Sequence, residues 1–557
     1  MSIDNSEKLK RFNISGIPLI KSVSEMLGLK SIFKKHISSY GNETVPSVDT
    51  LMFLIWNITL GRQPLYELYE WIRDIDPKCH GLDREQVASF NDDRFGRALD
   101  KLYAADRATL MTEIVVTMIK KINLDMARLH NDSTTVKAYG KISGVTKDGL
   151  RMAKGNNKDH RPDLVHLVFS LTISSDGAIP VHYKTYPGNR TDDTTHIETW
   201  NTVREIAGKS DFIYVADSKV CTSKQLSHIV SNGGRVITVM PNTYKETKIF
   251  KDELLSTNMP RKIILKRKVE EGESDNEYFS LFSGDYETIN EGYAIYWYLS
   301  SQKKKLDKAI RQKRVSRADS ALMELSAKLN KRDLITEEAI IDETGEILNK
   351  YSLNDFFKIN ISTRTEKIRV KIGKGRPGPL AEYRSVSKTS YALDWEIDRQ
   401  RLKKEERADG IFPLLSTDKS IGPKEALVSY KYQPKLEKRF NQFKSVHEAA
   451  PILFKNIQRV EAIMFLFFVA LIVQGIIERK VRMSMKERSI KSLPIYPEYR
   501  SSFYPTTSKI FYNFDGISSY KILKDDKVIK EFRDELSSNQ KLLLGLLDIN
   551  EDDFWGK

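Results

Sequence analysis

Asp211-Phe-Ile-Tyr-Val-Ala-Asp217-Ser-Lys219 contains a continuous apolar run, Phe212 to Ala216, that ends on an acid. An apolar run of this length between polar residues predicts a buried β-strand. Asp217 then stands at the carboxyl end of the strand, and in open α/β sheets this edge is where ligands bind. The run therefore predicts an α/β fold with a polar site at one edge of its sheet.

A second acid, Asp132, follows another candidate strand. The segment Leu124 to Leu129 leads into an extended run, and Asp132-Ser-Thr-Thr continues it. Between the two acids, residues 164–173 and 179–186 are rich in β-forming residues and predict two strands, whereas residues 197–206 predict a helix. Asp132 and Asp217 are therefore expected at the carboxyl ends of strands in one sheet.

A third acid lies in Tyr430-Lys-Tyr-Gln-Pro-Lys-Leu-Glu437-Lys-Arg-Phe-Asn-Gln-Phe-Lys444, among basic and aromatic residues. Pro434 lacks a backbone donor and suits a first helical turn, so a helix is expected to begin near it with Glu437 one turn in. Three converging carboxylates would repel one another without a cation. Oxygen-only ligands suit Mg²⁺ or Mn²⁺, and together they outline a two-metal phosphoryl-transfer site.

These motifs resemble the insertion-sequence DDE transposases of bacteria, in particular the group with a Tyr-x2-Arg-x3-Glu-x6-Lys motif. Tyr430, Gln433, Glu437 and Lys444 occupy the motif positions, and Gln433 departs from the family's Arg. The resemblance implies an α/β fold: an RNase H-like mixed-sheet catalytic core interrupted by a mostly β insertion domain, with a helical N-terminal region. Since Gln cannot clamp phosphate as Arg does, Lys435 or Arg439 would supply that contact.

The resemblance also implies an activity, which is cut-and-paste transposition with two Mg²⁺ or Mn²⁺ ions in each active site. The implied catalytic and metal-binding residues are Asp132, Asp217 and Glu437. The implied DNA-binding residues are Tyr430, Gln433, Lys435, Arg439 and Lys444. The implied partners are double-stranded DNA, as terminal inverted repeats and target, and a second copy in a homodimer. A metal-dependent nuclease on the same core, or a non-catalytic DNA-binding protein derived from a transposase, stays open.

The spacing of the acids predicts how the chain is divided. Asp132 and Asp217 are 85 residues apart, whereas Asp217 and Glu437 are 220 apart, which is too long for a simple connection and predicts an inserted domain. The expected regions are 1–120 (helical, for DNA ends or dimerisation), 121–243 and 426–485 (the two parts of the core), 244–425 (β-rich insertion with a basic helix) and 486–557 (C-terminal). Within the insertion, Arg376 in the loop 373–378 resembles a minor-groove contact.

Composition agrees with a polyanionic partner and a reducing compartment. The chain has 557 residues and a formal charge of +15, and its two cysteines lie in unrelated contexts. The first residues lack an apolar signal core, so a cytoplasmic, nucleoid-associated protein is expected. The apolar run Ala462 to Val473 is twelve residues long, short of the ~20 that a bilayer requires, which predicts a buried core helix and no membrane contact.

Overall fold

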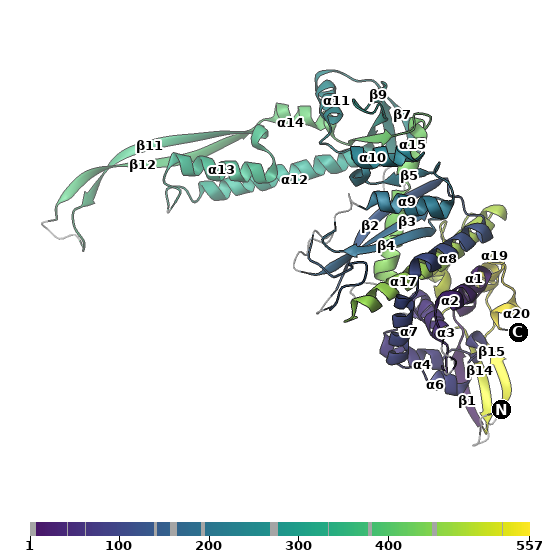
Figure 1. Ribbon diagram of the computed structural model, residues 1–557. Coiled ribbons are helices and arrows are strands. Elements are labelled where there is room, and N and C mark those ends of the chain that lie inside the picture. The colour runs from purple at the N-terminus through teal and green to yellow at the C-terminus, as the bar shows by residue number, and fades with distance from the viewer. Residues whose placement is uncertain are drawn as a thin grey trace. The chain divides into compact units, whose positions relative to one another are not determined.

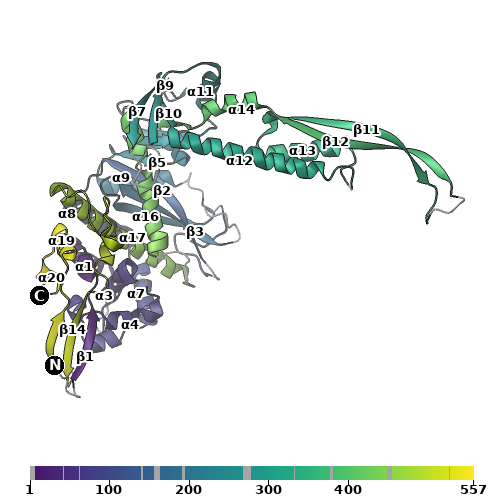
Figure 2. The ribbon, with the colours of Figure 1, turned by 180° about the vertical axis from the view of Figure 1, so that it is seen from behind.

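The computed structural model has a mixed α/β fold and divides into two compact units (Figures 1 and 2). Unit 1 comprises Met1–Thr238 with Glu425–Lys557, and unit 2 is Val239–Lys424. The structure describes residues 7–39, 41, 43–61, 63–138, 142–155, 164–190, 195–267, 277–331, 333–376, 381–447, 454–525 and 527–556. Each unit is described by itself.

Five strands of unit 1 form a mixed sheet in the order β4-β3-β2-β5-β6. They are β2 (Arg128–Lys137), β3 (His166–Ser174), β4 (Pro180–Pro187), β5 (Ile213–Ala216) and β6 (Arg235–Val239). β3 runs antiparallel to β2 and β4, whereas β5 runs parallel to β2 and β6. Every residue of β3 and of β5 is buried, so the centre of this sheet is covered on both faces.

The helices of unit 1 that contact this sheet include α9 (His196–Ala207), α16 (Gln433–Asn441) and α17 (Ile457–Glu487). α17 contains the apolar run found in the sequence and also packs against helices α1, α3, α7 and α19. By length and composition α17 could cross a membrane, but 94% of its apolar 18-residue window is buried inside the protein. This burial agrees with the expected core helix, because a helix that is apolar all round packs well inside a large protein.

The N-terminal part of unit 1 is helical, as the sequence predicts for most of it. Its helices are α1 (Ile17–Leu27), α2 (Leu29–His36), α3 (Ser47–Trp56), α4 (Leu68–Arg73), α5 (Pro77–His80), α6 (Arg84–Ala88), α7 (Asp92–Ala104) and α8 (Arg107–Ile122). The sequence did not predict β1 (Glu7–Asn13), which joins β14 (Ser518–Lys524) and β15 (Lys527–Arg533) in a separate sheet. The pairing partner of β1 lies about 500 residues away, so the local sequence does not indicate this strand.

The remaining helices of unit 1 are α10 (Ser223–Ser231), α15 (Pro423–Tyr430), α18 (Thr507–Tyr512), α19 (Ser538–Leu546) and α20 (Glu551–Phe554). α15 begins at the boundary between the units. It is followed by α16 after two residues, so the Tyr430 to Lys444 motif begins on the last residue of α15 and continues through α16.

The strands of unit 2 pair in the order β13-β10-β8-β7, with β9 paired to β10. The strands are β7 (Arg261–Arg267), β8 (Glu277–Phe282), β9 (Tyr286–Glu287), β10 (Ala294–Ser300) and β13 (Ile411–Ser416). Helices α11 (Lys245–Ser256), α12 (Ser301–Ser326), α13 (Glu337–Tyr351) and α14 (Arg399–Glu405) complete it together with the long strands β11 (Phe357–Lys371) and β12 (Tyr383–Ile397). Strands and a basic helix were expected in this part of the chain, and both are present, the basic helix being α12.

Candidate functional site

Asp132 and Asp217 lie on neighbouring parallel strands. The paired register of β2 and β5 runs from Arg128 opposite Ile213 to His130 opposite Val215, and each acid comes two residues further along its strand. Asp217 directly follows β5, as predicted. Asp132 was expected at the end of its strand, but it lies inside β2, because β2 continues along β3 to Lys137 after β5 has ended. The two acids nevertheless lie at the same height along the two neighbouring strands.

The Asp217 carboxylate is held at the strand end by local backbone contacts. Its Oδ1 accepts a hydrogen bond of 3.0 Å from the Lys219 backbone, while the Thr238 hydroxyl donates to the Asp217 carbonyl at 2.7 Å. His196, the first residue of α9, is 4% exposed at its side chain, and its Nε2 lies 3.9 Å from Asp217 Oδ1. Asp217 itself is 42% exposed at its side chain, so its carboxylate is accessible to a ligand.

Glu437 lies on α16, and the first residue of that helix ties it to β2. Gln433 Oε1 is 3.2 Å from His130 Nδ1, and Gln433 Nε2 donates to the Asn131 carbonyl at 3.3 Å. The His130 ring also packs against Tyr432, with ring centroids 4.9 Å apart. Glu437 is exposed, one helical turn beyond Gln433. Gln433 therefore fixes the helix of the third acid to the residues just before the first acid.

The Tyr430 phenol lies in the electrostatic field of all three acids. Burial is the main reason that the pKa of Tyr430 is raised to about 12, and the charges of Asp217, Asp132 and Glu437 add to it. A phenol with this pKa keeps its proton at neutral pH and can donate a hydrogen bond.

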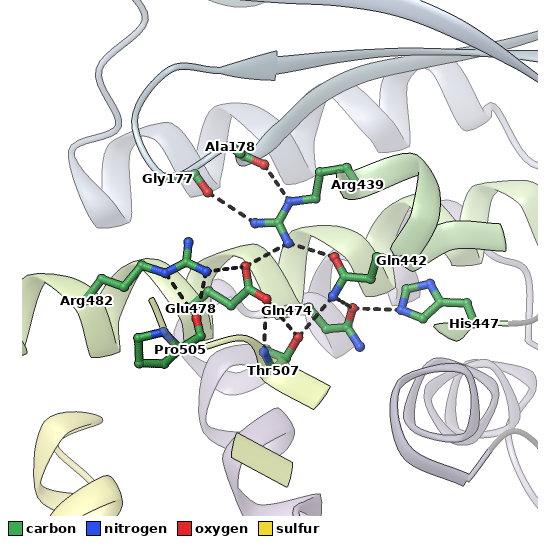
Figure 3. Close-up of polar contacts among 10 residues, drawn as sticks. All are labelled: Gly177, Ala178, Arg439, Gln442, His447, Gln474, Glu478, Arg482, Pro505 and Thr507. Carbon is green, nitrogen blue, oxygen red and sulfur yellow. Dashed lines mark hydrogen bonds and ion pairs between the residues drawn. The ribbon is translucent and has the colours of Figure 1, made fainter. Parts of the chain in front are cut away.

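Arg439 was expected to contact DNA, and its position in the structure does not fit that expectation (Figure 3). Its side chain is 5% exposed. Its guanidinium donates to the carbonyls of Ala178 at 2.8 Å and Gly177 at 3.1 Å and pairs with Glu478 at 2.9 Å. Because these donors are used inside the protein, Arg439 anchors α16 to the β3–β4 turn and to α17.

Glu478 is the centre of this buried polar cluster (Figure 3). Burial alone would raise the pKa of its carboxyl, but Arg439 and Arg482 outweigh it and the pKa is lowered. Thr507 donates to Glu478 Oε1 from its backbone at 2.9 Å and from its hydroxyl at 3.1 Å. A buried carboxylate that is paired and hydrogen-bonded in this way is stable as an ion. The cluster thus connects α16, α17 and the C-terminal region.

The remaining predicted DNA-binding residues have different surroundings. Lys435 is half-buried, with its ammonium 3.9 Å from the centre of the Tyr504 ring. Lys444 is half-buried in a π-helical turn that follows α16. Arg376 is exposed in unit 2, where it belongs to a different compact unit from the acids; residues 377 and 378 of its predicted loop lie outside the described residues.

The three acids have the donor chemistry that Mg²⁺ or Mn²⁺ requires, since carboxylate oxygens are the ligands these ions prefer. Across the described residues, however, no group of three or more His, Cys, Asp or Glu side chains is gathered closely enough to hold one ion. The donor set therefore fits the chemistry of these metals, while a closed metal cage is not formed among the residues described. Asp132, Asp217 and Glu437 are the side chains that would hold the ions.

Two histidines that the sequence motifs did not indicate, His130 and His196, lie next to the acids. His130 precedes Asp132 by two residues, and burial lowers its pKa to about 4, so the ring is neutral at neutral pH. His196 Nδ1 lies 3.0 Å from the Tyr214 hydroxyl, and its other nitrogen faces Asp217. The position of His130 between an expected strand and Asp132 could have identified it from the sequence. A lone histidine at the start of a helix carries no such indication, so His196 could not be identified in this way.

Comparison with known proteins yields matches to a protein family and to solved structures. Residues 9–116 match the model of a family described as a domain of unknown function, DUF4277. Among solved structures, the chain is similar to the piggyBac transposase in a synaptic complex with hairpin DNA, at 12% identity and a TM-score of 0.23. That similarity covers 53% of this chain and 63% of the piggyBac chain. No curated protein matches.

Proposed function

We propose that this protein is a DNA transposase of the DDE type with an RNase H-like core. It would cut phosphodiesters at the ends of a mobile element and join the free 3′-hydroxyl to target DNA. The observation that carries the proposal is that Asp132 and Asp217 lie at the same level on two neighbouring strands, while Gln433 ties the Glu437 helix to β2 just before Asp132. Asp132 and Asp217 are 85 residues apart in the sequence, and Asp217 and Glu437 are 220 apart, so this arrangement comes from the fold and not from local sequence.

Each of these residues has a role in the proposed reaction. Asp132, Asp217 and Glu437 would hold two Mg²⁺ or Mn²⁺ ions, and the chemistry that such ions would supply is activation of the attacking oxygen and stabilisation of the leaving oxygen. Tyr430 keeps its proton and can donate to a phosphate oxygen. Gln433 holds the Glu437 helix against β2 through His130 and the Asn131 carbonyl, where the family's Arg would contact phosphate.

Cleavage of a duplex that carries the element's terminal sequence tests this proposal. The chain offers a matched pair of variants, because Asp211 and Asp217 flank the same strand, β5, and Asp211 is exposed. We expect Asp217→Asn to lose Mg²⁺-dependent cleavage while still binding the duplex, and Asp211→Asn to cut like the wild type. Glu437→Gln is expected to behave like Asp217→Asn.

Three results would change the proposal. If the wild type binds the duplex but does not cut it with Mg²⁺ or Mn²⁺, the protein is a non-catalytic DNA-binding protein. If it cuts but never joins the 3′-hydroxyl to a second duplex, it is a nuclease on the same core. If Asp217→Asn also abolishes binding, or Asp211→Asn abolishes cleavage equally, the acids maintain the fold and do not form the catalytic site.

A further inference from the structure

The strands β11 and β12 of unit 2 form an isolated two-stranded ribbon. They pair antiparallel along their whole length, from Phe357 opposite Ile397 to Lys371 opposite Tyr383. In Figure 1 the ribbon continues beyond the helix pair α12 and α13. Its base and its distal part therefore have different neighbours, although the register is unbroken.

At the base, one face of the ribbon packs on α12 and α13. Phe357 and Leu393 are buried in a cluster with Leu322 and Ile340 of these helices, and Trp395 packs against the cluster and donates from its Nε1 to Asp319 at 2.7 Å. Successive side chains of a strand point to opposite faces, so the residues of this face follow at every second position. This rule identifies the same face further along the ribbon.

On the distal part, that same face becomes basic. β11 contributes Lys367, Arg369 and Lys371, and the residues opposite the first two on β12 are Ser387 and Ser385. The three cations are about 7 Å apart along the strand, which is two residue steps. We call Lys367, Arg369 and Lys371 with the facing serines the basic face. No acid lies on this face between Thr363 and Lys371.

The cations of the basic face are available to a ligand. Lys367 and Arg369 are exposed, and neither forms an ion pair with any residue that the structure describes. The ammonium of Lys371 donates to the carbonyls of Gly375 and Arg376, at 2.9 Å each, and these contacts leave its charge unneutralised.

The opposite face also has three cations on its distal part, Arg364, Lys388 and Arg384, but they have different neighbours. Arg364 is paired with Glu366 at 2.7 Å, and Glu366 also lies opposite Lys388. Beyond them, Ile368 faces Val386 and separates these charges from Arg384. This face therefore has an acid and an apolar patch where the basic face has only cations and hydroxyls.

We propose that the basic face binds the sugar–phosphate backbone of duplex DNA, independently of sequence. Lysine, arginine and serine are the side chains that contact phosphates, and a two-stranded ribbon is narrow enough for the major groove of B-DNA. A second copy of the chain would bring like charges together, and a membrane surface would need a broad apolar face beside the cations, whereas the large apolar side chain beside them on this distal part is Tyr383, opposite Lys371. The inference rests on the proposed function only in its choice of DNA as the polyanion.

The two faces provide a matched test with the full-length protein. Lys367→Ser/Arg369→Ser/Lys371→Ser removes three charges from the basic face, and Arg364→Ser/Arg384→Ser/Lys388→Ser removes three from the opposite face. Affinity for a labelled 40-base-pair duplex of arbitrary sequence is measured by fluorescence anisotropy over a series of salt concentrations. Thermal unfolding of each variant shows whether it is folded, and Lys367→Ser/Arg369→Ser leaves the loop contacts of Lys371 intact.

We expect the basic-face variant to bind at least about tenfold more weakly and to lose about 2 to 3 from the slope of log affinity against log salt, as for three phosphate contacts. The opposite-face variant should lose less than about threefold. Equal losses for the two variants would mean that only net charge matters and would overturn the proposal, as would no loss for either. A basic-face variant that changes the oligomeric state but not the DNA affinity would also overturn it.

This test is independent of cleavage. Asp217→Asn should bind the arbitrary duplex like the wild type, because its carboxylate is not on the ribbon. A wild type that binds through the basic face but never cuts would leave this inference standing and reject the transposase proposal. If the wild type cuts DNA but the basic-face variant binds the duplex as tightly as the wild type, the transposase proposal stands and this inference is rejected.

Discussion

Arg439 and Arg369 show how differently the two units use the same side chain. Arg439 of unit 1 is 4% exposed, and its guanidinium contacts two carbonyls, an amide and a carboxylate. Arg369 of unit 2 is exposed on a ribbon face without acids. Both occur in basic stretches of the sequence. Burial and pairing decide that the first maintains the position of a helix, whereas the second is free to contact a ligand.

The buried arginine should have the largest effect on stability. Arg439→Met leaves Glu478 with Arg482 as its remaining cation and removes the anchors of α16, so we expect a loss of about 3 to 5 kcal/mol in the free energy of unfolding. Chemical denaturation measures it. Arg482→Met, at a side chain that is 16% exposed, is the control and should cost less. A loss below about 1 kcal/mol for Arg439→Met would mean that the cluster does not stabilise the fold.

His130 should make stability depend on pH. Its pKa is lowered to about 4 by burial, from 6.5, so between these values the unfolded chain binds a proton that the folded chain does not. Stability is therefore fully present above pH 6.5 and is lost as the pH falls toward 4, by about 1.4 kcal/mol for each unit of pKa difference. His130→Gln should flatten the dependence of the free energy of unfolding on pH between these values. An unchanged dependence would show that the folded chain does not hold His130 as a buried, neutral ring.

Substitutions of Gln433 should have a smaller effect on the free energy of unfolding. They test whether Gln433 positions α16. Gln433→Ala removes two hydrogen bonds to β2, and we expect a loss of about 1 to 2 kcal/mol in the free energy of unfolding. Gln433→Glu retains a hydrogen-bond acceptor for His130 and should lose less at neutral pH. If both variants are as stable as the wild type, the contacts with His130 and Asn131 do not hold the helix.

The ribbon arginine should have the smallest effect on stability. Arg369→Ala removes an exposed side chain without an ion pair among the described residues, so the free energy of unfolding should change by less than about 0.5 kcal/mol. Thermal or chemical unfolding checks this. A loss comparable to that of Arg439→Met would mean that Arg369 stabilises the ribbon and would remove the contrast between the two arginines.

The sequence by itself determined the elements whose signal is local. The apolar run that ends at Asp217, the strands and helix between the first two acids, and the apolar helix near residue 465 all follow from periodicity and run length. The mixed α/β fold was predictable for the same reason. The Tyr430 to Lys444 motif also gave the helix that begins near Pro434, because proline suits a first turn.

Only the tertiary structure decided which face of each helix or strand is covered, and which part of the chain covers it. Asp132 lies inside its strand because β3 extends the pairing of β2, and β1 exists because β14, far along the chain, pairs with it. Arg439 is buried because α17 and the β3–β4 turn cover its face of α16, whereas the basic face of the ribbon is exposed because the helices that cover its base end earlier. Local spacing fixes the face on which a residue lies, but partners distant in sequence fix whether that face is covered.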